Sequence, residues 1–254
     1  KNGSEISSKV VPGPTLYSLP TRGNADLTIG KINNDLSANI AEILWFDNGH
    51  QNANLTFVPQ IHTYLSLKYG ISQDGSQPVY NNSSSTVVWD YSDCNKDDFD
   101  NRITGLLRED CYNVEHTKST NQDDEAILTG VLGSSFNSSG TFGTNKQYFL
   151  WGDDNGDIST TFNTSDVPIN VSPLNTGLAT RDYKRIERIW KVSEYNNSGT
   201  AIGDISYEFD LSGTIIEDNL SLANEDIIVL YDADNDGDFS DETHASGGII
   251  LPSS

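Results

Sequence analysis

An acidic run near the end of the chain has the residue types and the spacing of a cation site. Residues 232–242 have the sequence DADNDGDFSDE, with carboxylates at alternate positions and a glycine at the sixth. Calcium takes about six to eight oxygen ligands, and a glycine at that position permits the sharp turn of a calcium loop. The spacing therefore predicts a Ca²⁺ site. Its expected ligands are Asp232, Asp234, Asp236 and Asp238, completed by Asp241 or Glu242.

The end of this run departs from an EF-hand and favours a hairpin loop. The twelfth position is Thr243, where an EF-hand carries a bidentate glutamate, and no helical pattern follows. The flanking residues 227–231 and 248–251 have a strand-like composition. We therefore expect the calcium site in the loop of a β-hairpin. The alternative is a solvated acidic turn, in which Asp, Asn and Gly serve backbone geometry.

A shorter acidic cluster follows an expected strand that ends at Trp151. It contains an Asn155-Gly156 dipeptide, which is itself typical of hairpin turns and favours a turn over a metal site. The cluster is therefore the second, weaker metal candidate. Its carboxylates are those of Asp153, Asp154 and Asp157.

The chain contains two cysteines, Cys94 and Cys111. It has no CxxC motif, and its composition is acidic and rich in Asn and Ser. In such a chain a cysteine pair is better explained by one disulfide bond than by a metal or redox site. The alternative is two reduced and unrelated thiols.

The sequence singles out no catalytic group. None of its four histidines lies beside a nucleophile motif, and the HExxH and clustered-cysteine patterns of zinc sites are missing from the sequence. The 37 acidic residues provide many carboxylate pairs, and no pair is marked out for glycoside hydrolysis. We therefore expect a noncatalytic protein.

The aromatic residues fall into two groups. Trp89, Trp151 and Trp190 occur in apolar strand motifs, so we expect them in the core rather than on a sugar-binding surface. Tyrosines in polar sequence contexts are the better candidates for an exposed glycan-binding surface. They are Tyr80, Tyr91, Tyr112 and Tyr195.

The charge and hydropathy of the chain exclude two classes of partner. It has 37 acidic and 15 basic residues, for a formal net charge of −22. This charge repels phosphate backbones and anionic lipids, so we expect no nucleic-acid partner and no electrostatic docking to membranes. The sequence contains no apolar run of about 18 residues, so we also expect no direct membrane insertion. The start at Lys1, without a signal peptide or an initiator Met, suggests a mature or trimmed piece of a longer protein.

The elements that position these residues are mostly strands. Short apolar or alternating segments recur along the chain between clusters of Asn, Asp, Gly and Ser, which is typical of all-β proteins. Residues 202–211 show the clearest alternation, with Ile205, Tyr207, Phe209 and Leu211 on one face. A second expected strand, at 185–193, loses its alternation at Arg188-Ile189. Two sheets packed face to face would bury the apolar sides of such strands.

One helix is expected in the same pattern. Apolar residues from Phe57 to Tyr69 recur mostly at three- and four-residue steps, and Gly70 supplies a C-terminal stop. The predicted fold class is therefore all-β: a jelly-roll-like β-sandwich with one connecting α-helix.

Several motifs resemble known families. Residues 40–47 (IAEILWFD), followed by YLSLKYGI at 64–71, resemble the final strand and trailing helix of laminin-G-like, concanavalin-type lectin domains. The later motifs resemble a domain of unknown function that follows such lectin modules in large secreted, adhesin-like surface proteins of Bacteroidota. They are VVWD at 87–90, FDNRITG at 99–105, FLWG at 149–152, ERIWKV at 187–192 and VLYD at 229–232.

The resemblance implies an extracellular, cell-surface location and supplies no catalytic residue. It divides the chain into lectin-like strands at 1–52, a connecting helix at 53–72, and a β-sandwich with the Asp-rich loop at 73–254. We expect a noncatalytic structural or adhesive module stabilised by Ca²⁺. Its expected partners are neighbouring domains of a longer chain, with glycans or another surface protein as further candidates. The alternative is a carbohydrate-binding accessory domain of a secreted polysaccharide-degrading enzyme.

Overall fold

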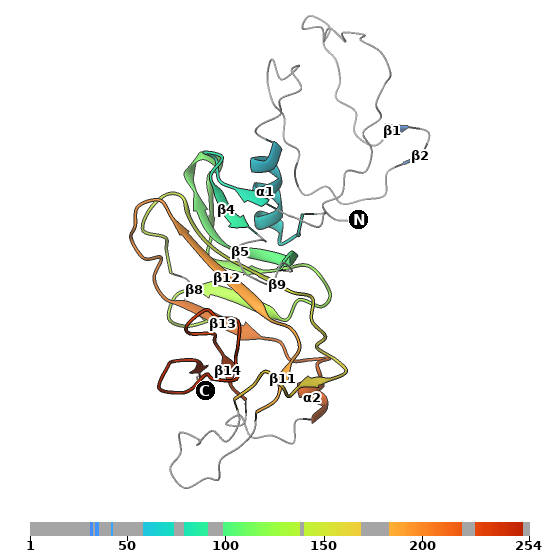
Figure 1. Ribbon diagram of the computed structural model, residues 1–254. Coiled ribbons are helices and arrows are strands. Elements are labelled where there is room, and N and C mark those ends of the chain that lie inside the picture. The colour runs from blue at the N-terminus through green and yellow to red at the C-terminus, as the bar shows by residue number, and fades with distance from the viewer. Residues whose placement is uncertain are drawn as a thin grey trace, which may run out of the picture. The chain divides into compact units, whose positions relative to one another are not determined.

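The computed structural model (Figure 1) divides the chain into two units, Glu5–Leu55 and the remainder. It describes residues 31–32, 34–35, 42, 58–73, 79–90, 99–137, 140–168, 183–219 and 227–250. In the first unit, β1 (Lys31–Ile32) pairs with β2 (Asn34–Asp35) in antiparallel fashion. Most of the lectin-like strands expected at 1–52 lie outside the described residues. The elements below all belong to the second unit.

Two antiparallel sheets form the body of the second unit. The four-stranded sheet has the order β12-β9-β5-β6, and the three-stranded sheet has the order β13-β8-β7. Their strands are β5 (Asn101–Glu109), β6 (Val114–His116), β7 (Lys118–Thr120), β8 (Leu128–Leu132), β9 (Gln147–Asp153), β12 (Trp190–Asn196) and β13 (Ile205–Phe209). The predicted all-β sandwich is confirmed.

The two central strands of the larger sheet, β5 and β9, are buried on both faces. Side chains alternate along a strand, so each strand supplies two cores. Ile103 and Leu150 belong to one buried apolar cluster, whereas Leu106 and Trp151 belong to another on the opposite face. These strands therefore have nearly continuous burial, unlike an edge strand with one wet face.

The space between the two sheets holds one of these apolar clusters. Trp151 belongs to it and contacts the Tyr207 ring edge-on, with 5.8 Å between ring centroids. Gly130 on β8 makes room for the indole, since a Cβ there would lie 2.6 Å from Trp151 Cη2. Ile205, Tyr207 and Phe209 pack against this cluster as predicted, whereas Leu211 lies beyond the end of the strand at Phe209.

The opposite face of the larger sheet is covered by a helix and a small hairpin. Helix α1 (Val58–Tyr69) and the hairpin of β3 (Val79–Asn81) and β4 (Val87–Asp90) bury Leu67, Tyr80 and Trp89 against β5 and β9 (Figure 1). The helix ends at Tyr69 and is followed by Gly70, whose φ of 63° is accessible to glycine at little cost. The predicted helix and its glycine stop are confirmed, and the helix packs within the same unit as the sheets.

Short elements complete the described part of the chain. The 3-10 helix η1 (Asp110–Tyr112) and helix α2 (Ile215–Asn219) lie in connections, and two small hairpins pair antiparallel. One hairpin contains β10 (Phe162–Asn163) and β11 (Arg185–Ile186), and the other contains β14 (Val229–Leu230) and β15 (Ile249–Ile250). The strands predicted on either side of the Asp-rich loop are therefore present. Among the residues described, no helix has the length and apolarity needed to cross a membrane.

The structure corrects one of the aromatic predictions. Trp89 and Trp151 are buried in the core as expected, and Trp190 is half-buried against Phe209. Tyr80, expected on an exposed binding surface, is instead 0% exposed because β3 lies beneath α1. Tyr112 and Tyr195 are half-buried, and Tyr91 lies outside the described residues.

Candidate functional site

The Asp-rich loop brings three of its predicted ligands together. It joins β14 to β15, and ligand oxygens of Asp232, Asp234 and Asp236 all lie within 4.8 Å of one another. In the described part of the chain this is the one group of three or more carboxylate, imidazole or thiol groups with that geometry. The spacing of alternate aspartates therefore gives the convergence that was predicted from the sequence.

The backbone of the loop explains the residues between the aspartates. The Asp232 carboxylate accepts hydrogen bonds from the backbone N–H groups of Asp236, at 3.2 Å, and Gly237, at 2.9 Å. These bonds close a turn in which Asn235 and Gly237 have φ values of 62° and 83°. Asn and Gly are the residues that adopt this left-handed region at least cost.

The remaining predicted ligands lie close to this group without joining it. Burial raises the pKa of Asp241, and the negative charges of Asp236, Asp234 and Asp238 raise it further. The Asp238 carboxylate accepts a hydrogen bond from the Ser240 N–H at 2.8 Å. The negative charges of the neighbouring aspartates therefore act on the Asp241 carboxylate.

Glu242, the alternative fifth ligand, has a structural role in the hairpin. It is buried, and its carboxylate accepts hydrogen bonds from the Ala233 N–H at 2.6 Å and from Ser246 Oγ at 2.9 Å. These bonds hold the two ends of the loop together. Asp241 is accordingly the better candidate for the fifth position.

A contact distant in sequence fixes the Asp-rich loop to the β10–β11 hairpin. The Phe239 N–H donates to Asp166 Oδ1 at 2.9 Å, and Asp166 Oδ2 pairs with Arg185 Nη2 at 2.9 Å. The Arg185 guanidinium lies over the Phe239 ring, 5.5 Å from its centroid. No local sequence signal marks this contact, because its partners are 73 residues apart.

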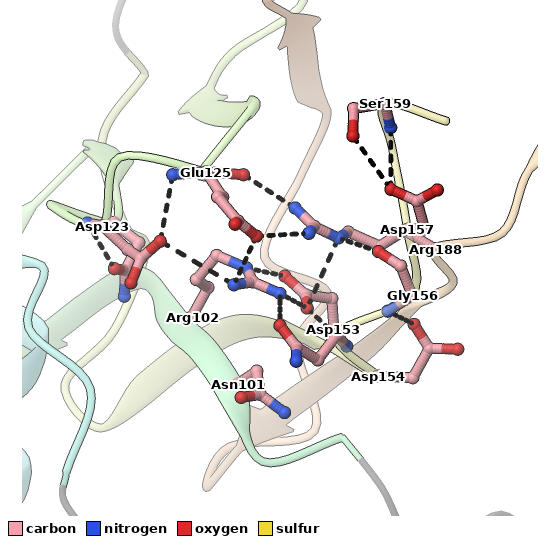
Figure 2. A network of polar contacts seen from close by, with 12 residues as sticks. Asn101, Arg102, Asp123, Glu125, Asp153, Asp154, Gly156, Asp157, Ser159 and Arg188 are labelled. Atoms are coloured by element: carbon pink, nitrogen blue, oxygen red, sulfur yellow. Dashed lines mark hydrogen bonds and ion pairs between the residues drawn. The ribbon is translucent and has the colours of Figure 1, made fainter. Parts of the chain in front are cut away.

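The second acidic cluster forms a different kind of site, a buried network with two arginines (Figure 2). Arg102 Nε and Nη2 donate to the two Asp153 oxygens at 2.8 and 2.5 Å. Arg188 Nε lies 3.8 Å from Asp153 Oδ1, and the Glu125 carboxylate pairs with Arg188 at 3.0 Å and with Arg102 at 3.5 Å. Asp153 is therefore neutralised by the chain itself.

Irregular backbone at two places positions the two arginines of this network. Arg102 lies at a β-bulge in β5 and has a φ of 46°, and Arg188 lies in the short connection between β11 and β12. That connection explains the break in alternation seen in the sequence at Arg188. Burial lowers the pKa of Arg102, but the hydrogen bond and charge of Asp153 outweigh it, so the pKa is raised overall.

The other two carboxylates of the weaker metal candidate also have partners within the protein. Asp154 Oδ1 accepts hydrogen bonds from the N–H groups of Gly156, at 2.9 Å, and Ile189, at 3.0 Å. Hydrogen bonds from the Thr160 hydroxyl and the Ser159 backbone lower the pKa of Asp157 far below its usual range. Asp153, Asp154 and Asp157 do not form a metal-ligating group of the kind seen at Asp232.

An open pocket of about 510 Å³ borders the network, lined in part by Glu125, Asp157, Arg188 and Ser212. All three Arg188 guanidinium nitrogens donate to the protein: Nε to the Gly156 carbonyl, Nη1 to the Glu125 carbonyl and Nη2 to the Glu125 carboxylate. The arginine is therefore used to hold loops together rather than to receive a ligand.

The predicted disulfide is not seen at the cysteine that the structure describes. Cys111 lies in η1, is exposed and forms no disulfide with a residue that the structure describes. Its expected partner, Cys94, lies outside the described residues. The pairing therefore stays a prediction.

Comparison with known proteins gives one match. No curated protein and no solved structure matches the chain. The model of a family described as a domain of unknown function (DUF8202) matches residues 58–250. This match begins at the first residue of α1 and ends at the last residue of β15, so it includes both sheets, the arginine network and the Asp-rich loop. The chain therefore belongs to the DUF8202 family of domains of unknown function.

Proposed function

We propose that this chain is a noncatalytic structural module of a large extracellular surface protein and that Ca²⁺ stabilises its C-terminal hairpin. The observation that carries the proposal is the convergence of Asp232, Asp234 and Asp236, whose ligand oxygens lie within 4.8 Å of one another. Within the described ranges, no arginine or lysine forms an ion pair with these carboxylates. A bound cation would supply positive charge to these carboxylates.

Calcium fits this loop better than other common cations. Hard oxygen ligands on a water-exposed loop suit Ca²⁺, whereas Mg²⁺ requires near-ideal octahedral geometry and zinc prefers nitrogen and sulfur ligands. A site of this kind, open to water, belongs to the weak range of about 10⁻⁴ to 10⁻³ M that is typical of extracellular modules.

A structural role follows from where the loop is attached. The Phe239–Asp166–Arg185 contact joins it to the β10–β11 hairpin, so an ion that orders the loop also strengthens this attachment. Ca²⁺ would thereby stiffen one end of the module against force or proteolysis. Neighbouring domains of a longer chain are the proposed partners of a module of this kind.

Thermal unfolding of the whole chain tests this proposal. Because Ca²⁺ would bind the folded state and not the unfolded one, free Ca²⁺ at one hundred times its dissociation constant adds about 2.7 kcal/mol to the free energy of unfolding. For a chain of this length we expect the Tm to be about 5 to 10 °C higher in Ca²⁺ than in EGTA. Equal Tm values in Ca²⁺, in Mg²⁺ and in EGTA would contradict the proposal.

A further inference from the structure

One histidine connects strand β6 to the end of helix α1. His116 is the last residue of β6 and pairs with Leu107 of β5, which belongs to the apolar cluster beneath α1. Directly paired residues share a face of the sheet, so the imidazole is on the side that the helix covers. There it donates a hydrogen bond to the backbone carbonyl of Leu67. Leu67 lies in the last turn of α1, where carbonyls have no partner within the helix, so His116 caps the helix end.

The second ring nitrogen of His116 is enclosed. Nδ1 is buried and has no hydrogen-bond partner. In the neutral imidazole this nitrogen is a bare acceptor, whereas protonation converts it to a donor on a charged ring. A buried, charged donor without an acceptor is costly. The contact with α1 therefore suits the neutral form of the side chain.

The charged groups of the neighbouring elements also oppose protonation of His116. A pocket of about 400 Å³ lies beside the imidazole, where the end of α1 meets β6, β7 and β8. Its titratable lining consists of Lys68 and Tyr69 from α1 and Lys118 from β7, besides His116 itself, and none of its described lining residues is acidic. The Lys68 ammonium donates to the Tyr64 hydroxyl. Two lysines and no carboxylate thus face this side of the imidazole.

The carboxylates of the two paired strands are bonded to other groups. Glu109 on β5 accepts a hydrogen bond from the Tyr148 hydroxyl at 2.8 Å, and Glu115 on β6 accepts one from the Phe142 N–H at 3.1 Å. Burial of the imidazole lowers the pKa of His116, and its backbone hydrogen bond offsets this only in part. Geometry and charge therefore act in the same direction.

We propose that His116 is a pH-sensitive latch, which holds the end of α1 on the sheet while neutral and releases it on acidification. Protonation favours release because Nδ1–H reaches an acceptor only when the ring leaves its enclosed position and meets water. The stabilising contribution is present above the ordinary histidine pKa of 6.5 and is lost as the pH falls from there toward the lowered folded-state pKa. This inference does not depend on the calcium loop.

Hydrogen exchange of the whole chain at pH 7.5 and pH 5, at constant ionic strength, tests the proposal. Two amides report on the latch: Ile71 N–H donates to the Ser66 carbonyl at 2.9 Å, and Gln122 N–H donates to the Gly70 carbonyl at 2.7 Å. After correction for the intrinsic pH dependence of exchange, their protection should fall at least about fivefold at pH 5, the lower end of what a buried unpaired donor costs. The Ile215 amide in α2, which is bonded outside this region, should keep its protection.

Two glutamine variants separate His116 from other titrating groups. His116→Gln keeps an N–H donor for the Leu67 carbonyl but does not titrate, so the protection of both reporter amides should become independent of pH. His62→Gln is the matched control, because it removes an exposed histidine from the same helix and should keep the wild-type response.

Three results would overturn the proposal. The first is equal protection of the Ile71 and Gln122 amides at the two pH values. The second is the same loss of protection in His116→Gln, which would assign the response to other groups. The third is read from the wild type by NMR titration of its imidazole rings and so does not require the variant to fold. In that titration the His116 ring should protonate below pH 6.5, and protonation at or above this value would exclude the latch.

Discussion

The two acidic loops of this protein have nearly the same local sequence and different electrostatics. Residues 153–157 are DDNGD, and residues 234–238 are DNDGD. In the first loop Asp153 is 2% exposed and paired with Arg102. In the second, three carboxylates converge at the exposed tip of a hairpin, with no basic partner among the residues described. The same residue types therefore serve an internal salt bridge in one place and form a candidate cation site in the other.

The difference lies in what the rest of the fold brings to each loop. Asp153 ends β9, the strand paired with β5, and the β5 bulge places Arg102 beside it from 51 residues away. The second loop extends beyond the short β14–β15 hairpin, and its contact with Asp166 is made through a backbone N–H. An acidic pattern alone does not determine whether a metal is needed. A distant arginine supplies the positive charge in the first loop, and the proposed Ca²⁺ would supply it in the second.

The largest predicted effect comes from removing Arg102, the positively charged side chain that pairs with the buried Asp153. Arg102→Ala leaves Asp153 buried with its main partner gone, and we expect it to lower the free energy of unfolding by about 3 to 5 kcal/mol. Urea denaturation of the whole chain measures this change. Asp110→Ala is the control, because it removes the exposed Arg108–Asp110 pair while Arg108 keeps its hydrogen bond to the Phe142 carbonyl, and its loss should have little effect. Similar losses for the two variants would contradict the account.

A double substitution in the Asp-rich loop should destabilise the protein in Ca²⁺ but not in EGTA. In saturating Ca²⁺, Asp234→Asn with Asp236→Asn should cost up to about 2.7 kcal/mol, the binding contribution at one hundred times the dissociation constant. In EGTA the same variant should be as stable as the wild type or more so, because like charges are removed. Asp153→Asn, by contrast, should destabilise the protein under both conditions. Identical responses of the two loops would remove the distinction between them.

A smaller effect is expected at the contact between the Asp-rich loop and the β10–β11 hairpin. Asp166→Ala removes the acceptor of the Phe239 N–H and the partner of Arg185, and we expect a loss of about 1 to 2 kcal/mol. Asp166→Asn keeps an oxygen acceptor and should cost less. Hydrogen exchange at the Phe239 amide provides a local readout. Unchanged protection of this amide in Asp166→Ala would show that the contact does not hold the loop.

The smallest predicted effects are those of pH on stability, which should have opposite signs in the two loops. A raised pKa means that Asp241 stabilises the folded state when protonated, and this contribution is lost as the pH rises through its folded-state pKa. The lowered pKa of Asp157 has the opposite sign, so its contribution is present at neutral pH and is lost on acidification. In EGTA at pH 7, Asp241→Asn should raise the Tm and Asp157→Asn should lower it. Shifts of the same sign would contradict this assignment.

Periodicity and turn chemistry were sufficient to predict most of the fold. The alternation of Ile205, Tyr207 and Phe209 identified β13 and its buried face, and Gly70 identified the end of α1. The spacing of alternate aspartates likewise predicted the convergence at Asp232. These features depend on residues close together in the sequence, where the geometry of a strand, a helix or a turn fixes the arrangement.

The features that sequence reasoning missed depend on contacts between distant segments. Arg102 and Arg188 lie in different parts of the chain, and only the pairing of β5, β9 and β12 brings them to the same carboxylate. Tyr80 has polar neighbours in the sequence, yet α1 covers it. Strands β6 and β7 are short and polar, so their sequences carry no strand signal.

The most direct test of the central claim is a Ca²⁺ titration that observes both acidic loops in one amide NMR spectrum. The account predicts saturable shifts for residues 232–242, with a dissociation constant of about 10⁻⁴ to 10⁻³ M, and unchanged resonances for residues 153–157. Asp234→Asn with Asp236→Asn should abolish the shifts. Unchanged resonances at 232–242, or a response confined to 153–157, would contradict the assignment of the cation site.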